Sequence, residues 1–392
     1  MTIRICGDEH MGVRLGNICR FQSGGTPSKG KPEFFNGTIP WITTTALNGG
    51  NIGKESAVDW ISEQAIKESA AKIVPAFSIM VGTRVGVGKV AINTTSMSTS
   101  QDIVSLLDID ENVWSKAFLC KFLQAKGTFL NSQARGATIK GIKIDVLSEL
   151  ELPGIPMEEQ QHISQIIDKI KAIIVIRQQQ LQKLDDLVKA RFVELFGGIH
   201  NSNKYPYKPI KELTDVISGG TPNRDVNEYW ECGTIPWVKT TELQNNLIKE
   251  VDEYITEKGL NSSSAKLVPP GTVLIAMYGQ GKTRGMTAYL NIEACTNQAC
   301  ACILPSDQIN QTFLWKFLIL SYDDLRGMAK GGNQPNLNGT IIKNYPILYP
   351  PRELQEQFAA FVAQTDKTKA VIQKALDEAQ LLFDSLMQKY FG

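Results

Sequence analysis

The chain has 392 residues, of which 42% are hydrophobic, and its 41 basic and 40 acidic residues leave a formal net charge of +1. This length predicts two or three domains. The charge balance neither requires nor excludes nucleic acid, although a DNA-binding protein of this composition must cluster its positive charge locally. No apolar run approaches the roughly 18 residues that span a bilayer, and residues 1–12 contain Asp8 and Glu9 instead of an apolar signal segment. We therefore expect a cytoplasmic protein that does not enter a membrane.

Motifs of the first half of the chain recur in the second half, at an offset of about 195 residues. The matched segments are Ser23–Pro27 with Ser218–Pro222, Gly37–Trp41 with Gly233–Trp237, Thr44–Leu47 with Thr240–Leu243, and Ala71–Pro75 with Ala265–Pro269. Solenoid repeats have periods of roughly 20–50 residues, so this period is too long for a solenoid. The pattern predicts one unit of about half the chain, used twice.

Residues 1–155 are predicted to form the first globular domain, of mixed α/β structure and rich in Gly, Pro and Thr. Within it, Phe77–Val81 reads as a strand and residues 63–71 as a short helix. A long helix is expected next, because residues 157–196 contain neither Pro nor Gly and a Gly pair follows them. Residues 156–198 are assigned to this first long helix.

Residues 199–350 are predicted to repeat the globular domain, with a strand at 272–276, matched to 77–81 at the same offset, and a helix at 312–320. Residues 351–392 are predicted to form the second long helix. Each helix would be roughly 60 Å long, at about 1.5 Å per residue.

Apolar residues on both helices recur in alternating steps of four and three, which is the pattern of a heptad seam. The seam residues are Ile163, Ile167, Ile170, Ile174, Leu181, Leu184, Val188 and Leu195 in the first helix, and Phe358, Val362, Ile372, Leu376, Phe383 and Leu386 in the second. The two seams share one phase, so we expect the helices to pack on each other. The polar seam residues Arg177, Thr365 and Lys369 can fix the register of that pair. The alternative is that each helix only covers its own domain.

Residues 279–283, Gly-Gln-Gly-Lys-Thr, resemble the end of a phosphate-binding loop. That loop needs a glycine where Ala276 stands, and no helical pattern follows. We interpret the segment as a hairpin tip that carries Lys282 and Arg284, with Arg84 and Lys89 in the related place of the first copy. Such a tip suits phosphates or guanine edges, and a solvated turn is the alternative.

The two Ser-Gly-Gly-Thr-Pro loops are interpreted as structural turns whose glycines supply positive φ, with DNA contact as the second reading. Basic and hydroxyl side chains near these loops and at the hairpin tips are candidate DNA contacts, since Arg and Lys bind phosphate or guanine. The amide-rich stretch 333–336 is a further candidate, because Asn and Gln read adenine, and Arg135 and Lys140 hold the corresponding place in the first copy. The candidates are Lys29, Lys31, Thr44, Thr45, Arg84, Lys89, Arg135, Lys140, Arg224, Lys239, Thr240, Thr241, Gln280, Lys282, Arg284, Asn333, Gln334 and Asn336.

The sequence offers no pattern for a metal, a cofactor or a catalytic centre. Cys295, Cys300 and Cys302 lack a Cys-x-x-Cys pair and a nearby histidine, so we interpret them as buried, reduced strand cysteines. The chain contains no dinucleotide fingerprint, no tetrad for base methylation and no nucleophile elbow, and its three histidines stand beside no candidate nucleophile. We expect no catalytic residue and no bound metal.

The pattern as a whole resembles the specificity subunit of type I restriction-modification systems. In each half, Ser-Gly-Gly-Thr-Pro and Ile-Pro-Trp stand near the start, and a Pro-x-x-x-Gln helix start, Pro156–Gln160 or Pro351–Gln355, follows the domain. The resemblance covers nearly the whole chain, although the first ten or so residues have no counterpart in the family pattern.

The resemblance implies that each globular domain is a target recognition domain for one half of a split, asymmetric DNA site. The two helices would pack antiparallel as a spacer with pseudo-twofold symmetry, and they would bind two methyltransferase subunits that carry S-adenosylmethionine. ATP-dependent motor-nuclease subunits would join for cleavage. The chain itself would bind double-stranded DNA, need no cofactor and perform no chemistry. Two other hypotheses stay open: a non-catalytic coiled-coil scaffold that binds only protein, and a fragment of a fused restriction-methylation enzyme.

Overall fold

The structure is a computed structural model that describes residues 12–136, 140–199, 203–279, 281–329 and 336–392. The chain forms two compact units: unit 1 comprises residues 1–178 with 374–392, and unit 2 comprises residues 179–373. Each unit therefore contains one globular domain and one half of each long helix. Among the described helices, none is both long and apolar enough to cross a membrane.

Unit 1 is built on a five-stranded sheet of order β2-β10-β7-β8-β4, accompanied by a four-stranded sheet β5-β3-β9-β6 and the pair β1-β11. Its strands are β1 Val13–Arg14, β2 Arg20–Ser23, β3 Ile39–Ile42, β4 Asn51–Ile52, β5 Asp59–Ile61, β6 Ile73–Val74, β7 Ile79–Gly82, β8 Val90–Asn93, β9 Met97–Thr99, β10 Ile103–Leu107 and β11 Glu151–Leu152. Its short helices are α1 Glu63–Glu68, α2 Lys116–Ala125, α3 Gly127–Gln133 and α4 Ile144–Ser148.

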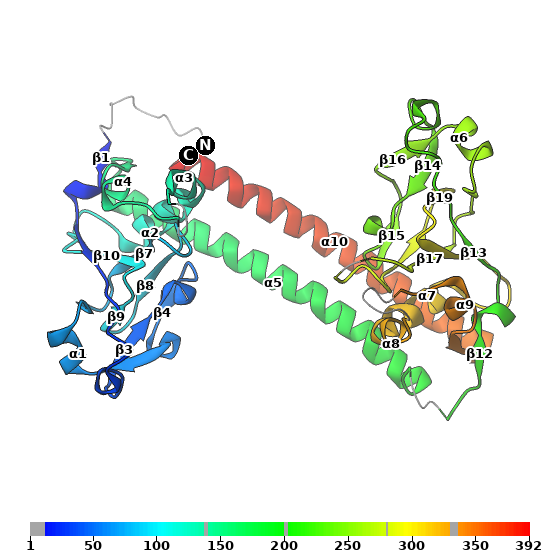
Figure 1. Cartoon of the computed structure of the whole chain (residues 1–392), viewed down its shortest axis with the longest axis horizontal. Helices are drawn as coiled ribbons and strands as arrows, with labels where there is room; N and C mark the ends of the chain where they lie inside the picture. The colour runs from blue at the N-terminus through cyan, green and yellow to red at the C-terminus, as the bar shows by residue number, and fades with distance from the viewer. Residues whose placement is uncertain (1–11, 137–139, 200–202, 280, 330–335) are drawn as a thin grey trace. The chain divides into compact units, whose positions relative to one another are not determined.

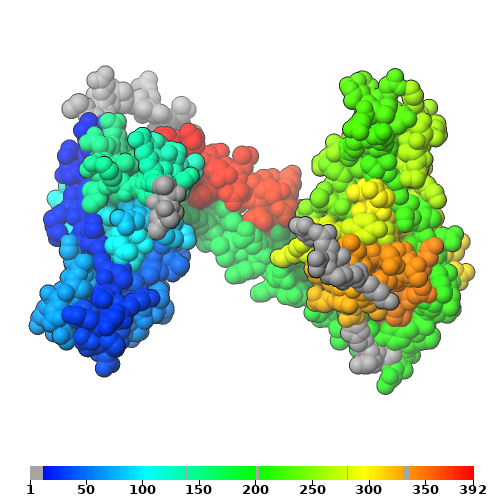
Figure 2. Space-filling model, viewed as in Figure 1, coloured from blue at the N-terminus to red at the C-terminus, as the bar shows by residue number. Residues whose placement is uncertain are grey.

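Unit 2 repeats this plan, with a five-stranded sheet β13-β20-β17-β18-β15, a three-stranded sheet β16-β14-β19 and the pair β12-β21. Its strands are β12 Tyr207–Pro209, β13 Val216–Ser218, β14 Ile235–Val238, β15 Asn246–Ile248, β16 Glu253–Ile255, β17 Val273–Ala276, β18 Thr287–Leu290, β19 Cys295–Thr296, β20 Cys300–Ile303 and β21 Pro346–Leu348. Its short helices are α6 Glu257–Asn261, α7 Gln311–Leu320, α8 Tyr322–Gly327 and α9 Gly339–Lys343. The smaller sheet and α6 form a lobe that projects from the body of unit 2 (Figure 2).

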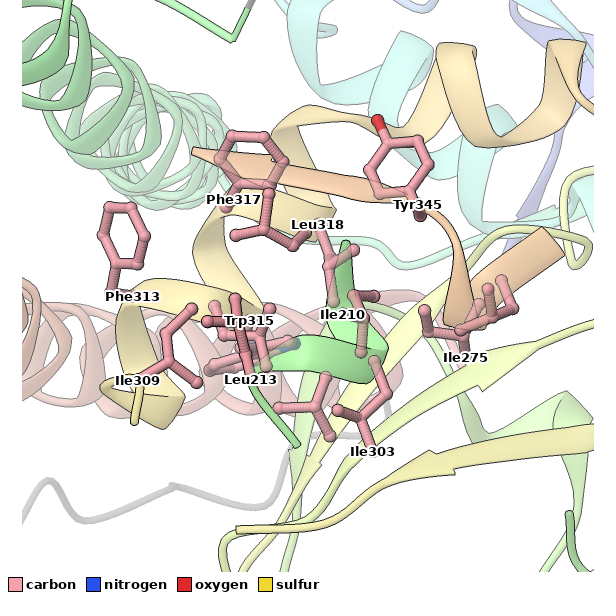
Figure 3. Packing of buried hydrophobic residues seen from close by; sticks show 14 of the residues in the cluster. Ile210, Leu213, Ile275, Ile303, Ile309, Phe313, Trp315, Phe317, Leu318 and Tyr345 are labelled. Carbon is pink, nitrogen blue, oxygen red and sulfur yellow. The ribbon is translucent and has the colours of Figure 1, made fainter. Parts of the chain in front are cut away.

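The core of unit 2 lies between its five-stranded sheet, α7 and the long helices. Figure 3 shows Phe313 and Phe317 of α7 in the same cluster as Ile275 of β17 and Ile303 of β20. The predicted mixed α/β class is confirmed, as are the predicted short helices at 63–71 and 312–320, which appear as α1 and α7.

The two long helices are α5 Met157–Phe196 and α10 Arg352–Phe391. In unit 1, Ile163 and Ile167 from the start of α5 share a core with Phe391 from the end of α10. In unit 2, Phe192 from the end of α5 packs on Phe358 from the start of α10, with ring centres 5.5 Å apart. The helices therefore pair antiparallel in both units (Figure 1). Every predicted seam residue is buried or half-buried.

At the last turns of α5 the most deeply buried positions depart from the heptad pattern. The heptad steps select Leu195, which is half-buried, whereas Phe192 and Phe196 are fully buried. From Val188 the buried positions follow in steps of four, because this end of the helix packs into the globular core of unit 2 and no longer only against α10. In the same unit, the polar seam residue Lys369 forms an ion pair with Asp185 of α5.

The Pro-x-x-x-Gln signature attaches each long helix to its domain. Gln160 is 1% exposed. Its amide oxygen accepts the Ser115 N–H at 2.9 Å, and its amide nitrogen donates to the Val113 and Ile155 carbonyls at 3.0 and 2.9 Å. Gln355 repeats this in unit 2, where it accepts from Asn310 N–H at 2.9 Å and donates to the Pro350 carbonyl at 2.8 Å. A buried amide with these bonds fixes the first turn of the helix against the domain.

The Ser-Gly-Gly-Thr-Pro and Ile-Pro-Trp motifs are structural partners. The indole N–H of Trp41 donates to the Gly25 carbonyl at 3.0 Å, and Trp237 donates to Gly220 at the same distance. The predicted reason for the glycines is wrong, because none of the four has positive φ. They are required by close approach: a Cβ on Gly24 would lie 2.3 Å from the Ser100 carbonyl oxygen.

The strand predicted at 77–81 is β7, which begins at Ile79. The matching strand β17 begins at Val273, so the offset between the two copies is 194 residues here instead of 195. Phe77 has φ of 62° and its N–H donates to the Asn93 carbonyl at 2.7 Å, while Gly271 has φ of 88° and donates to the Leu290 carbonyl at 2.7 Å. Phe77 thus corresponds to Gly271. By the same register, Thr83 corresponds to Met277 and Arg84 to Tyr278.

Candidate nucleic-acid interface

The predicted hairpin tips are confirmed as connections between antiparallel strands, β7 with β8 and β17 with β18. Each tip is held by a segment from much later in the chain. The N–H of Ile142 donates to the Thr83 carbonyl at 2.8 Å, and the N–H of Leu337 donates to the Met277 carbonyl at 3.0 Å. Both units therefore present the same loop scaffold. A phosphate-binding loop is followed by a helix, whereas residues 279–283 are followed by strand β18, so this segment is not such a loop.

In unit 1 this scaffold carries a cationic hollow of about 510 Å³, lined by Arg84, Arg135 and Lys143 among others. Arg135 and Gly141 exchange two backbone hydrogen bonds of 2.9 and 3.0 Å, which places Arg135 at the base of its loop. Arg84 lies 4.0 Å from the carboxylate of Asp102. Two sequence candidates, Arg84 and Arg135, are thus brought together. Lys143 was missed, because only the fold places the start of α4 beside the hairpin tip.

In unit 2 the tip is supported from α8, which the sequence did not indicate. The guanidinium of Arg326 donates to the carbonyls of Arg284 and Gly281, both at 2.8 Å, and the hydroxyl of Tyr322 donates to the Lys282 carbonyl at 2.7 Å. These bonds leave the side chain of Lys282 exposed to solvent.

Around the first Ser-Gly-Gly-Thr-Pro loop, Lys29 and Thr45 are exposed. Lys31 contacts its own domain, with its ammonium 3.5 Å from Glu68 and 4.7 Å from the ring centre of Phe34. Thr44 is buried in a short 3-10 helix, Thr44–Ala46. Of these four candidates, Lys29, Lys31 and Thr45 have the accessibility that a DNA contact requires, and Thr44 does not.

In unit 2 the related basic residues are paired within the domain. The guanidinium of Arg224 stacks 3.7 Å from the ring centre of Trp230 and bonds Glu253 at 2.5 Å. Lys239 bonds Glu253 at 3.0 Å and lies 3.4 Å from Asp252. The hydrogen bond to Glu253 raises the pKa of Lys239. Contact with DNA would compete with these ion pairs.

The remaining candidates divide by accessibility. Lys89, Lys140 and Thr241 are exposed, whereas Thr240, Arg284 and Asn336 are half-buried. Gln280, Asn333 and Gln334 lie outside the described residues.

Cys295, Cys300 and Cys302 are buried in β19 and β20, which confirms them as strand cysteines. Burial raises the pKa of the Cys302 thiol to about 11, so it is neutral near pH 7. No group of three His, Cys, Asp or Glu side chains suited to a metal occurs among the described residues.

The sequence matches a family model described as the type I restriction modification DNA specificity domain, over residues 8–186 and again over 203–381. The MjaIX specificity subunit of Methanocaldococcus jannaschii is 22% identical, across 96% of this chain and 91% of that protein. The EcoR124I/EcoR124II specificity subunit of Escherichia coli is 30% identical over 41% of this chain and 40% of that protein.

Solved structures show the same fold. The specificity subunit of a type I system from M. genitalium covers 100% of this chain and 99% of its own, with a TM-score of 0.58 and 16% identity. A chain from a structural study of type I restriction-modification assembly covers 97% and 96%, with a TM-score of 0.62 and 18% identity. The resemblance drawn from the motifs is confirmed. The chain therefore belongs to the specificity subunits of type I restriction-modification systems and carries two DNA specificity domains.

Proposed function

We propose that this chain reads a bipartite, asymmetric DNA site, with residues 1–155 on one half-site and residues 199–350 on the other. The spacer helices, residues 156–198 and 351–392, would set the gap between the half-sites. The observation that carries the proposal is that both units hold the same hairpin tip with the same backbone bond, Ile142 to Thr83 and Leu337 to Met277, but equip it with different side chains. A shared scaffold with different polar side chains suits two readers of different sequence.

The long helices carry exposed apolar side chains at repeated positions, which supports the docking of two identical methyltransferase subunits. Ile176 and Leu187 of α5 are 51% and 47% exposed, and Val371 and Leu382 of α10 are 70% and 50% exposed. Within each helix the two residues are eleven positions apart, about three turns, and so share one face. Position 176 matches 371 and position 187 matches 382 at the 195-residue offset, so the two helices offer equivalent contacts to two copies of one partner.

The chain would contribute sequence choice and no catalysis. S-adenosylmethionine would be bound by the methyltransferase subunits, and ATP by motor-nuclease subunits where these join. This division of labour is supported by the family to which the chain belongs and by the absence of any catalytic motif in its sequence.

The test is methylome sequencing of cells that carry the chain, of cells that lack it, and of cells in which residues 13–155 are replaced by the matching domain of another family member. We expect one bipartite methylated motif that depends on the chain, and the replacement should change only one half of that motif. A motif that persists without the chain, or that changes in both halves after the exchange, would contradict the proposal.

The scaffold hypothesis is separated from DNA reading by the salt dependence of binding. We expect the chain, purified with its methyltransferase subunits, to bind a DNA duplex that contains the motif found by methylome sequencing. The affinity should fall steeply between 50 and 200 mM salt, since phosphate contacts release counterions. Binding to the partner subunits without any DNA binding would favour the scaffold.

A further inference from the structure

We propose that Arg84 is a base-reading residue that selects guanine in the half-site bound by unit 1, and that position 84, with its counterpart Tyr278 in unit 2, is a point at which the two readers differ in sequence preference. The inference rests on the proposed function and assigns a role to one residue of the same surface. Arginine pairs with guanine through two parallel hydrogen bonds to O6 and N7 in the major groove.

The equivalence of the two positions follows from backbone contacts. Thr83 N–H donates to the Asp102 carbonyl and Met277 N–H donates to the Ala299 carbonyl, each at 2.8 Å. The residue after each, Arg84 or Tyr278, is exposed at the same place on the hairpin tip. The two units thus display different side chains from one backbone position.

The surroundings of the position differ together with the side chain. In unit 1 the carboxylate of Asp102 lies 4.0 Å from the guanidinium of Arg84. In unit 2 the corresponding residue is Ala299, which has no charge to offer the tyrosine. Unit 1 thus has both the arginine and an acidic neighbour at this place, whereas unit 2 has neither.

A glycine adds a second constraint on the arginine. A Cβ at Gly141 would come within 2.9 Å of the Arg84 Cγ, so the absence of a side chain there lets the arginine stem lie against the backbone. The residue that precedes Leu337, and therefore corresponds to Gly141, is Asn336. The Arg84 stem therefore lies close to the backbone at Gly141, and its guanidinium lies 4.0 Å from one carboxylate while the side chain stays exposed. A phosphate contact needs no such fixed direction, whereas a bidentate base contact gains from it.

The experiment measures binding of the full-length chain, in complex with its methyltransferase subunits, to a library of duplexes randomised within the half-sites. For Arg84→Gln we expect the preference for guanine at one position of one half-site to fall roughly 5- to 150-fold, with the other half-site unchanged. The matched control is Lys143→Gln at the same hollow, which should weaken all duplexes equally and lower the salt slope by about one.

The transplant Tyr278→Arg with Ala299→Asp and Asn336→Gly should create a guanine preference in the second half-site. Equal weakening of all duplexes by Arg84→Gln, with a reduced salt slope, would assign Arg84 to phosphate and overturn this inference while leaving the proposed function intact. A wild-type complex without sequence preference would overturn the proposed function as well.

Discussion

At the scale of single residues, the glycines of the Ser-Gly-Gly-Thr-Pro loops are fixed by space. A Cβ on Gly24 would meet Thr99 Oγ1 at 2.2 Å, and one on Gly219 would meet Thr296 Oγ1 at 2.1 Å. The same crowding occurs in both copies, which explains why both keep the glycines while nearby basic residues differ. At each glycine, two segments of the domain cross with no room for a side chain.

We therefore expect Gly24→Ala to destabilise unit 1 by about 1–3 kcal/mol or more, the usual cost of overpacking. Gly30→Ala is the matched control, since a Cβ there comes no closer than 3.6 Å to another atom. Thermal unfolding of the full chain measures both, and equal melting temperatures for the two variants would contradict the crowding.

At the scale of elements, each long helix is attached to its domain by a glutamine and a lysine. Gln160 closes the first turn of α5 onto the segment before α2. Lys121 of α2 is nearly buried and lies 2.9 Å from the carboxylate of Asp168, two turns further along α5. In unit 2, Lys316 of α7 faces Asp366 of α10 at 3.9 Å, and burial lowers the pKa of Lys316. These contacts fix the orientation of each helix on its own domain.

Replacing Gln160 by leucine leaves a buried N–H and two carbonyls without their partner. The expected loss is about 1–3 kcal/mol for each polar group left unsatisfied in the folded state. The control is Gln161→Leu, because the neighbouring Gln161 is exposed. Urea unfolding followed by circular dichroism should show a lower midpoint for Gln160→Leu only. If Gln161→Leu lowered the midpoint as much, the attachment would not depend on the buried amide.

At the scale of the whole molecule, the chain uses one plan twice and so contains two DNA specificity domains and two long helices. α5 and α10 each run through both units, and their seam residues pack together in each. We therefore expect a change in the length of both helices to alter the proposed spacer and to leave each globular domain as it is.

Inserting one heptad into both helices, after Gln178 and after Gln373, would lengthen the pair by about 10 Å. Since DNA rises about 3.4 Å per base pair, the gap between half-sites should grow by about three base pairs. Methylome sequencing gives the gap directly. In the control chain, the same seven residues replace seven existing helix residues at each site, so that the helices keep their length. An unchanged gap between half-sites in the lengthened chain would refute the spacer role.

Sequence alone determined the duplication, both long helices, most of their seam and the family, because these depend on local periodicity and on motifs that can be compared within the chain. It also marked the hairpin tips as positive. Only the tertiary structure decided which marked residues meet. It joined Arg84, Arg135 and Lys143 around one hollow, and it tied Arg224 and Lys239 to acidic and aromatic neighbours. The physical reason is that these contacts join residues far apart in the sequence, through backbone hydrogen bonds such as Ile142 to Thr83, and such pairings leave no periodic signal in the chain.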